Sequence, residues 1–193
     1  MKVLVTYFEP FGDDSINSSE ECAKLLPEDI ETLRLPVSFR RAPQLAITRV
    51  EELRPDMVIC LGQAVRPVIA LERIAINMAN AAKPDNDGYC PHSEHIVSGG
   101  SDGIFTTYDV DSLAARLRDS GYPCQVSNSA GTYVCNALYY LLLQRGIPAL
   151  FVHLPLTPEQ ARIRPTVTSF VESALAAQSI ITLLSRLYPQ SEA

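Results

Sequence analysis

The sequence predicts an α/β protein, a three-layer α/β/α sandwich built on a mixed, largely parallel twisted sheet. Short apolar runs rich in β-branched residues alternate along the chain with longer segments of helical periodicity, as in proteins whose strands are joined by crossover helices. Such a sheet is covered by helices on both faces. The chain has 193 residues and no internal repeat, linker or low-complexity segment, so we expect a single domain over residues 1–193.

The first part of the chain opens with a β-branched run, residues 2–7, that predicts a buried strand. Pro and Gly in the next segment, 8–12, predict a loop. Asn17 and the serines after it are capping candidates followed by acidic residues, which predicts a helix over 17–26 ending before Pro27. The next expected elements are a strand, a helix and a second strand, over residues 31–37, 42–54 and 56–62.

The second part begins with a mixed apolar stretch, 68–78, and a polar region from 80 to 101 that is rich in Asp, Asn, Gly and Pro. We expect this polar region to form an extended surface loop. Residues 109–121 carry an Asp cap, apolar residues at helical spacing and a terminal Gly, which together predict a helix. The last expected elements are a strand and turn, a helix, a strand and a final helix, over 123–131, 132–146, 147–155 and 166–187.

Composition excludes several classes of partner. A net charge of −6, a pI near 5.1 and the lack of any basic run argue against binding to nucleic acid. The apolar run at the amino terminus is short and is broken by Glu9 and Pro10, so we expect neither a signal peptide nor a membrane span. The 5 cysteines are odd in number and lack CxxC spacing, which favours reduced thiols and a cytoplasmic location.

Cys135 is the candidate nucleophile. It follows a Gly-containing turn that leads into a predicted helix, so we expect it in the first helical turn. Free amides and the positive end of the helix dipole favour a thiolate there and would lower the pKa of the thiol. The alternative, which composition alone favours, is an inert buried cysteine on an amphipathic helix.

His153 and Glu72 could complete an acyl-transfer triad with this cysteine. His153 ends an apolar strand, where α/β enzymes place catalytic groups, although a hydrogen-bonded structural histidine is the alternative. Glu72 lies among apolar residues that usually exclude a carboxylate, and a surface ion pair with Arg73 is its alternative. Distance along the sequence does not establish that the three residues meet.

These residues lie in motifs that resemble those of the pyroglutamyl peptidase I family, also called pyrrolidone carboxyl peptidase. The motifs occur in order over most of the chain: FEPFG at 8–12, Asn17, GQA at 62–64, ERIAIN at 72–77, PDN at 84–86, AGTYVCN at 130–136, and FVHLP followed by PEQ. The resemblance assigns the family's triad to Cys135, His153 and Glu72. It implies a cysteine peptidase that hydrolyses N-terminal pyroglutamate from peptides through an acyl-enzyme, without a cofactor. Family members are commonly tetramers, so a homo-oligomer is expected.

The resemblance also implies a substrate pocket. Phenylalanines that contact the pyroglutamyl ring correspond to Phe8 and Phe11, and polar positions at or beside the pocket correspond to Asn17 and Gln63. Backbone groups that contact the lactam fall at two further positions, Tyr133 and Val134.

Two segments depart from the family pattern. GQAGGR appears here as GQAVRP, so Val65 and Arg66 replace glycines and Pro67 replaces an arginine. DARIPDN appears as NAAKPDN, so Ala82 replaces an active-site arginine and Lys83 replaces a pocket isoleucine. Lys83 or Arg66 could supply the missing cation, and the lysine could admit an acidic or otherwise altered substrate.

Three other interpretations remain open at the level of sequence. The altered segments are compatible with a noncatalytic binding protein on the same fold, or with a thiol hydrolase of different acyl specificity. Cys90, His92 and His95 have a spacing that could offer ligands to zinc, but no fourth ligand is evident, and we expect no metal.

Overall fold

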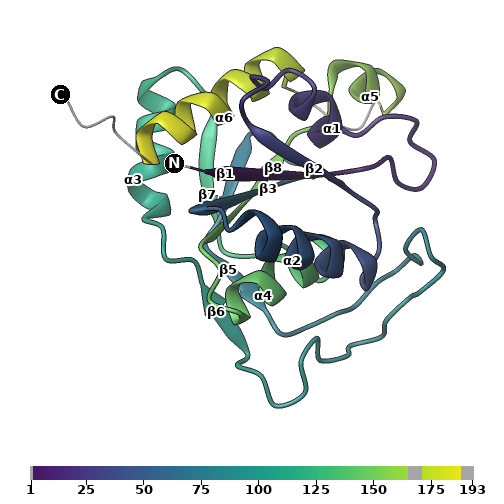
Figure 1. The fold of residues 1–193 in the computed structure, drawn as a ribbon. Helices are drawn as coiled ribbons and strands as arrows, with labels where there is room; N and C mark the ends of the chain where they lie inside the picture. Colours follow the sequence, from purple (N-terminus) through teal and green to yellow (C-terminus); the bar gives the residue numbers. More distant parts are fainter. Residues whose placement is uncertain (1, 165–170, 188–193) are drawn as a thin grey trace.

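The computed structural model describes residues 2–164 and 171–187, and its centre is a six-stranded sheet in the order β2-β1-β3-β8-β4-β7 (Figure 1). The strands are β1 (Val3–Phe8), β2 (Glu31–Leu35), β3 (Met57–Gln63), β4 (Ile69–Glu72), β7 (Cys124–Ser127) and β8 (Ala149–Leu154). Neighbouring strands are parallel except β4 and β8, which run antiparallel. The predicted mixed, largely parallel sheet is therefore confirmed.

Helices cover both faces of this sheet (Figure 1). One face carries α2 (Arg41–Leu53) and α4 (Val134–Gln144), and the other carries α1 (Ser18–Ala23), α3 (Val110–Asp119) and α6 (Ser173–Leu187). Alternate residues of each central strand enter two separate buried clusters, because successive side chains of a strand point to opposite faces. The sequence prediction of three layers is confirmed.

Local signals account for most of the helix boundaries. Asn17 caps α1 by accepting a hydrogen bond from the amide of Ser19, and Asp109 caps α3 in the same way through Ser112. Helix α2 ends at Leu53 and is followed by the capping residue Arg54, whose φ of 49° is left-handed and which lies immediately before a proline.

Several expected boundaries need correction. The first helix ends at Ala23 rather than at residue 26, and the apolar stretch 68–78 contains two short strands, β4 and β5 (Ile74–Ile76). β5 pairs with an unpredicted strand, β6 (Gly103–Phe105), and a short helix, α5 (Pro158–Ile163), follows β8. Of the final helix expected over 166–187, the residues 166–170 lie outside the described residues.

Residues 80–101 contain no helix or strand in the structure, as predicted. Hydrogen bonds hold this loop against the rest of the protein. The buried carboxylate of Asp85 accepts hydrogen bonds from the backbone amides of Phe39 and Tyr89, at 2.9 Å each. The amide of Asn80 donates to the carbonyl of Thr132, two residues before α4 begins. The loop therefore runs beside the start of α4.

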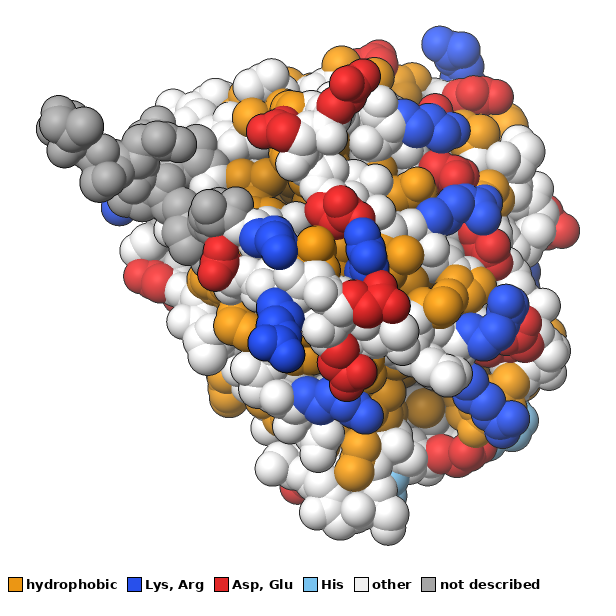
Figure 2. All heavy atoms as spheres, in the orientation of Figure 1, with side chains coloured by type: hydrophobic (Ala, Val, Ile, Leu, Met, Phe, Trp, Pro, Cys, Tyr) orange, Lys and Arg blue, Asp and Glu red, His pale blue; other side chains and the backbone are white. Residues whose placement is uncertain are grey.

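The surface carries charges of both signs. On the face shown in Figure 2, basic and acidic side chains are interspersed, and no large area of one sign appears there. A search of the described helices for a stretch long and apolar enough to cross a bilayer found none.

Candidate active site

The site is built on the α4 side of the sheet, where three adjacent strands meet. β8 lies between β3 and β4, and His153 lies near its carboxyl end with 4% of its surface exposed. In the parallel register of β3 and β8, Gly62 is the direct neighbour of His153. The imidazole therefore has β3 on one side and β4 on the other.

Glu72 approaches the imidazole from β4. Because β4 runs antiparallel to β8, this last residue of the strand lies opposite Phe151, two positions before His153. Its Oε1 lies 2.7 Å from Nδ1 of His153, and the side chain is completely buried. A carboxylate at Nδ1 fixes the orientation of the ring and leaves Nε2 available as a base.

Cys135 comes from helix α4, and its sulfur lies next to Gly62 of β3. It lies in the first turn of α4, as predicted, and its Sγ would be 3.2 Å from a Cβ built on Gly62. Such a Cβ would also lie 2.8 Å from the ring of Phe151, whose centroid is 4.8 Å from that of His153. The glycine thus leaves room for the sulfur beside the strand that carries the histidine.

The electrostatic environment of the thiol differs from the prediction. Burial, reinforced by the charge of Glu72, raises the pKa of Cys135 to about 12, while its own backbone amide and Arg66 act weakly in the opposite direction. The expectation that the helix start would lower this pKa is therefore wrong, because desolvation outweighs the dipole. A thiol with a raised pKa is neutral at rest, and a base would have to remove its proton before it could act as a nucleophile.

Arg66, rather than Arg73, is the ion-pair partner of Glu72. Its Nη1 lies 3.1 Å from Glu72 Oε1, whereas Arg73 turns outward and pairs with Asp111 at 2.6 Å. The alternative of a surface ion pair between Glu72 and Arg73 is therefore excluded. The arginine in GQAVRP also means that this segment still contributes a cation to the site.

A small cavity of about 80 Å³ opens beside the thiol. It is lined by Phe8, Phe11, Asn17, Val37, Gln63, Tyr133, Val134 and Cys135. The rings of Phe11 and Tyr133 lie 5.2 Å apart, and Phe39 supports Tyr133 from behind at 5.1 Å. The cavity therefore has aromatic walls, and it brings six of the seven residues predicted to bind substrate together with the predicted nucleophile.

The two polar side chains of this cavity are held by the protein. Asn17 donates from Nδ2 to the carbonyl of Glu9 at 3.0 Å, and its Oδ1 caps α1. Gln63 accepts from the amide of Ser18 at 2.8 Å and donates to Asp14 at 3.3 Å. Their positions are fixed before any ligand enters.

Lys83 is the predicted residue that lies outside the cavity. It is exposed and lines an adjoining cavity of about 240 Å³, which shares Phe11 and Gln63 with the first. Asp13, Asp14 and Arg164 line the same space. Lys83 therefore lies next to the cavity at Cys135 but does not line it.

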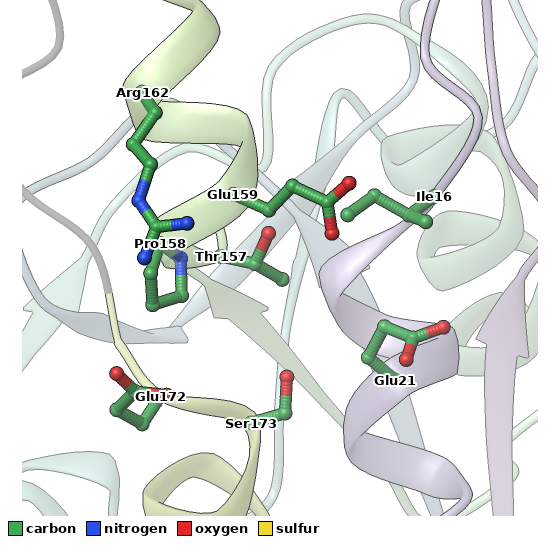
Figure 3. A pocket seen from close by; sticks show the side chains of 8 residues that line it. All are labelled: Ile16, Glu21, Thr157, Pro158, Glu159, Arg162, Glu172 and Ser173. Carbon is green, nitrogen blue, oxygen red and sulfur yellow. The ribbon is translucent and has the colours of Figure 1, made fainter.

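Another cavity, of about 280 Å³, lies between α1, α5 and the start of α6 (Figure 3). It is lined by Ile16, Glu21, Thr157, Pro158, Glu159, Arg162, Glu172 and Ser173. Figure 3 shows carboxylates from α1, from α5 and from Glu172, the residue before α6, but the lining contains neither a thiol nor an imidazole. We therefore assign the chemistry to the smaller cavity at Cys135.

The possible zinc ligands in the loop 80–101 do not come together. Cys90 donates its thiol hydrogen to the carbonyl of Ala81, at 3.4 Å. Within residues 2–164 and 171–187, no three His, Cys, Asp or Glu side chains are arranged to hold a metal ion.

Two residues of the site, Val37 and Gly62, were not among the site residues predicted from the sequence. Val37 ends a predicted strand, and nothing in the sequence distinguishes it from other apolar residues. Gly62 does carry a signal, because a glycine at the end of an apolar strand often marks the close approach of another group.

Comparison with known proteins gives a consistent result. The family model described as Pyroglutamyl peptidase matches residues 1–183. The Pyrrolidone-carboxylate peptidase of Thermococcus onnurineus is 40% identical to this chain, covering 94% of this chain and 96% of the relative. That of Vibrio parahaemolyticus is 44% identical, covering 83% of this chain and 81% of the relative.

Solved structures agree with the sequence matches. The pyroglutamyl peptidase I of Bacillus amyloliquefaciens has a TM-score of 0.87 at 31% identity, covering 94% of both chains. The pyrrolidone carboxyl peptidase of Fervidobacterium islandicum has a TM-score of 0.91 at 33% identity, covering 97% of this chain and 98% of the other. The similarity extends over nearly the whole of each chain.

Proposed function

The chain belongs to the pyroglutamyl peptidase family, and we propose that it is a cysteine peptidase that removes N-terminal pyroglutamate through Cys135, His153 and Glu72. One observation carries the assignment of these residues. The hydrogen bond of 2.7 Å between His153 and Glu72 lies beside a strand position kept open for the sulfur of Cys135, at the edge of a small aromatic cavity.

The order of the three groups across the sheet supports a reaction by acyl transfer. His153 takes the proton of Cys135, and the sulfur attacks the carbonyl carbon that joins the pyroglutamyl ring to the peptide. His153 then protonates the departing amine, and water hydrolyses the thioester. Glu72 holds the ring and stabilises the imidazolium formed in between. The free amides at the start of α4 are the proposed donors to the oxyanion.

The cavity suits a pyroglutamyl group, which is small, flat and uncharged. Phe8, Phe11 and Tyr133 would contact the ring, and the backbone at Val134 would meet the lactam. Asn17 and Gln63 are proposed to border this pocket and to keep its shape. The space lined by Lys83 would take the peptide that follows the ring.

Hydrolysis of a fluorogenic pyroglutamyl amide tests the proposal. Wild type should release the fluorophore, and Cys135→Ala should abolish release because it removes the thiol proposed to form the acyl-enzyme. Cys90→Ala is a matched control, since Cys90, like Cys135, is a free cysteine of intermediate exposure as a residue but lies outside the cavity. Equal, slow release by wild type and Cys135→Ala would disprove the peptidase assignment.

Two further outcomes would point to other functions. Thermal stabilisation by free pyroglutamate without turnover would indicate a binding protein. Turnover of other acyl amides, sensitive to iodoacetamide, would indicate a thiol hydrolase of different specificity.

The remaining partners and the location are also proposals. All five cysteines are free, which supports a reducing, cytoplasmic environment. A homo-oligomer is proposed from the family, and light scattering of the purified protein measures it directly.

A further inference from the structure

Arg66 contacts two parts of the active site that are far apart in the sequence. Its Nη1 lies 3.1 Å from Oε1 of Glu72, and its Nη2 donates to the carbonyl of Ser129 at 2.8 Å. Ser129 belongs to the segment that runs from β7 into α4, the helix that carries Cys135. The guanidinium of Arg66 therefore connects Glu72 to the segment that precedes α4, the helix of Cys135.

The need for this contact follows from the burial of Glu72. The carboxylate has no exposed surface, and within the described residues its Oε2 has no hydrogen-bond partner. Its Oε1 thus receives both the imidazole and the guanidinium. A buried charge without a partner is costly, and a neutral imidazole does not balance it. Arg66 is the cation that does.

We propose that Arg66 is a positioning residue of the triad, which balances the buried charge of Glu72, keeps its carboxylate directed at His153 and holds the loop before α4 in register with them. The inference rests on the proposed function of the site, since it assigns a role within the same reaction. Arg66 is 24% exposed and is not expected to touch the substrate ring.

The pH dependence of the reaction separates this role from simple structural support. Among the described residues, Glu72 interacts with His153 from β8, with Arg66 from the loop after β3, and with Cys135 and Tyr139 from α4, and Cys60 from β3 acts on the last two. Removing the guanidinium leaves the charge of Glu72 unopposed beside His153, which favours the protonated ring. His153 can then accept a proton only at a higher pH. The acidic limb of the pH profile, where kcat/KM rises with pH, should therefore move to higher pH.

The experiment compares Arg66→Met, Arg66→Lys and Arg73→Met on a fluorogenic pyroglutamyl amide. Arg66→Met should lower kcat/KM by about tenfold to 100-fold, mainly through kcat. It should also move the acidic limb upward by about half a pH unit or more. Arg66→Lys should recover part of both effects. Arg73→Met, which removes the neighbouring arginine paired with Asp111, should stay within about twofold of wild type with an unchanged limb.

A double-mutant cycle of Arg66 and Glu72, followed by the Tm, tests the interaction of the two residues without measuring turnover. Arg66→Met should lower the Tm, and adding Glu72→Gln to it should restore part of the loss, because the uncompensated charge is removed. If wild type hydrolyses no pyroglutamyl amide, the proposed function fails. The double-mutant cycle then still tests whether Arg66 and Glu72 interact. Additive losses of Tm, or an Arg66→Met enzyme with the wild-type rate and limb, would overturn the inference.

Discussion

At the scale of single residues, the site shows how neighbours decide what a side chain can do. Cys135 occupies the first turn of a helix, a position that ordinarily favours the thiolate. In this protein burial and the nearby carboxylate dominate, and the pKa rises to about 12. The proposed cycle therefore begins with proton transfer to His153 rather than with a preformed thiolate.

Lys83 gives a prediction about substrate preference. Lys83 lines the adjoining cavity, so its positive charge should favour an acidic residue directly after the pyroglutamate. Because the side chain is exposed, the effect should be small, about twofold to fivefold in KM on Lys83→Ala. Comparing KM for substrates with Glu and with Gln at that position, for both enzymes, measures it. Equal ratios in the two enzymes would show that Lys83 does not face the peptide.

At the scale of elements, the spacing of β3, β8 and α4 leaves no room for a side chain at position 62. Gly62→Ala would bring a methyl group to 2.8 Å from the ring of Phe151 and 3.2 Å from the sulfur of Cys135. We expect a loss of about 1–3 kcal/mol in the free energy of unfolding, with a large fall in kcat/KM. Denaturant unfolding and the fluorogenic assay measure the two effects.

Gly121 provides the control for this prediction. It follows α3, away from the site, and has a φ of +88° with open space around its Cβ position. Gly121→Ala should cost about 1–2 kcal/mol through backbone strain alone, and kcat/KM should not change. A Gly62→Ala enzyme with wild-type kcat/KM would contradict the packing described here.

At the scale of the whole molecule, we expect the buried thiols to make the free energy of unfolding decrease as the pH rises in the alkaline range. Burial raises the pKa of Cys22 and Cys60 from 9.0 to about 12. The folded protein therefore keeps protons that the unfolded chain releases above about pH 9. The stability that these neutral thiols contribute is complete below that pH and is lost as the pH rises toward 12.

The Tm should accordingly fall as the pH is raised from 8 to 11, and each such thiol should add a slope of about 1.4 kcal/mol per pH unit. Cys60→Ala should make the Tm fall less steeply with pH, because unfolding of this variant releases one proton fewer in this range. Melting curves of both proteins across that range measure the difference. Parallel curves would show that Cys60 does not titrate on unfolding.

The sequence by itself determined the class of the fold and most of its elements. Apolar runs and helical periodicity depend on neighbours in the chain, as do the caps at Asn17 and Asp109. The ordered motifs led to the family, which the comparisons confirm, and to the proposed roles of Cys135, His153 and Glu72. These features could be predicted because each depends on a pattern of residues that are close together in the sequence.

The tertiary structure alone decided which groups meet. The antiparallel course of β4 sets Glu72 beside β8, and strand order puts the strand of His153 between β4 and β3, whose Gly62 lies next to the thiol. Arg66 rather than Arg73 became the partner of the acid, and Lys83 came to line a neighbouring cavity. Such contacts, like the desolvation that sets the pKa of Cys135, depend on segments far apart in the chain, and no local pattern encodes them.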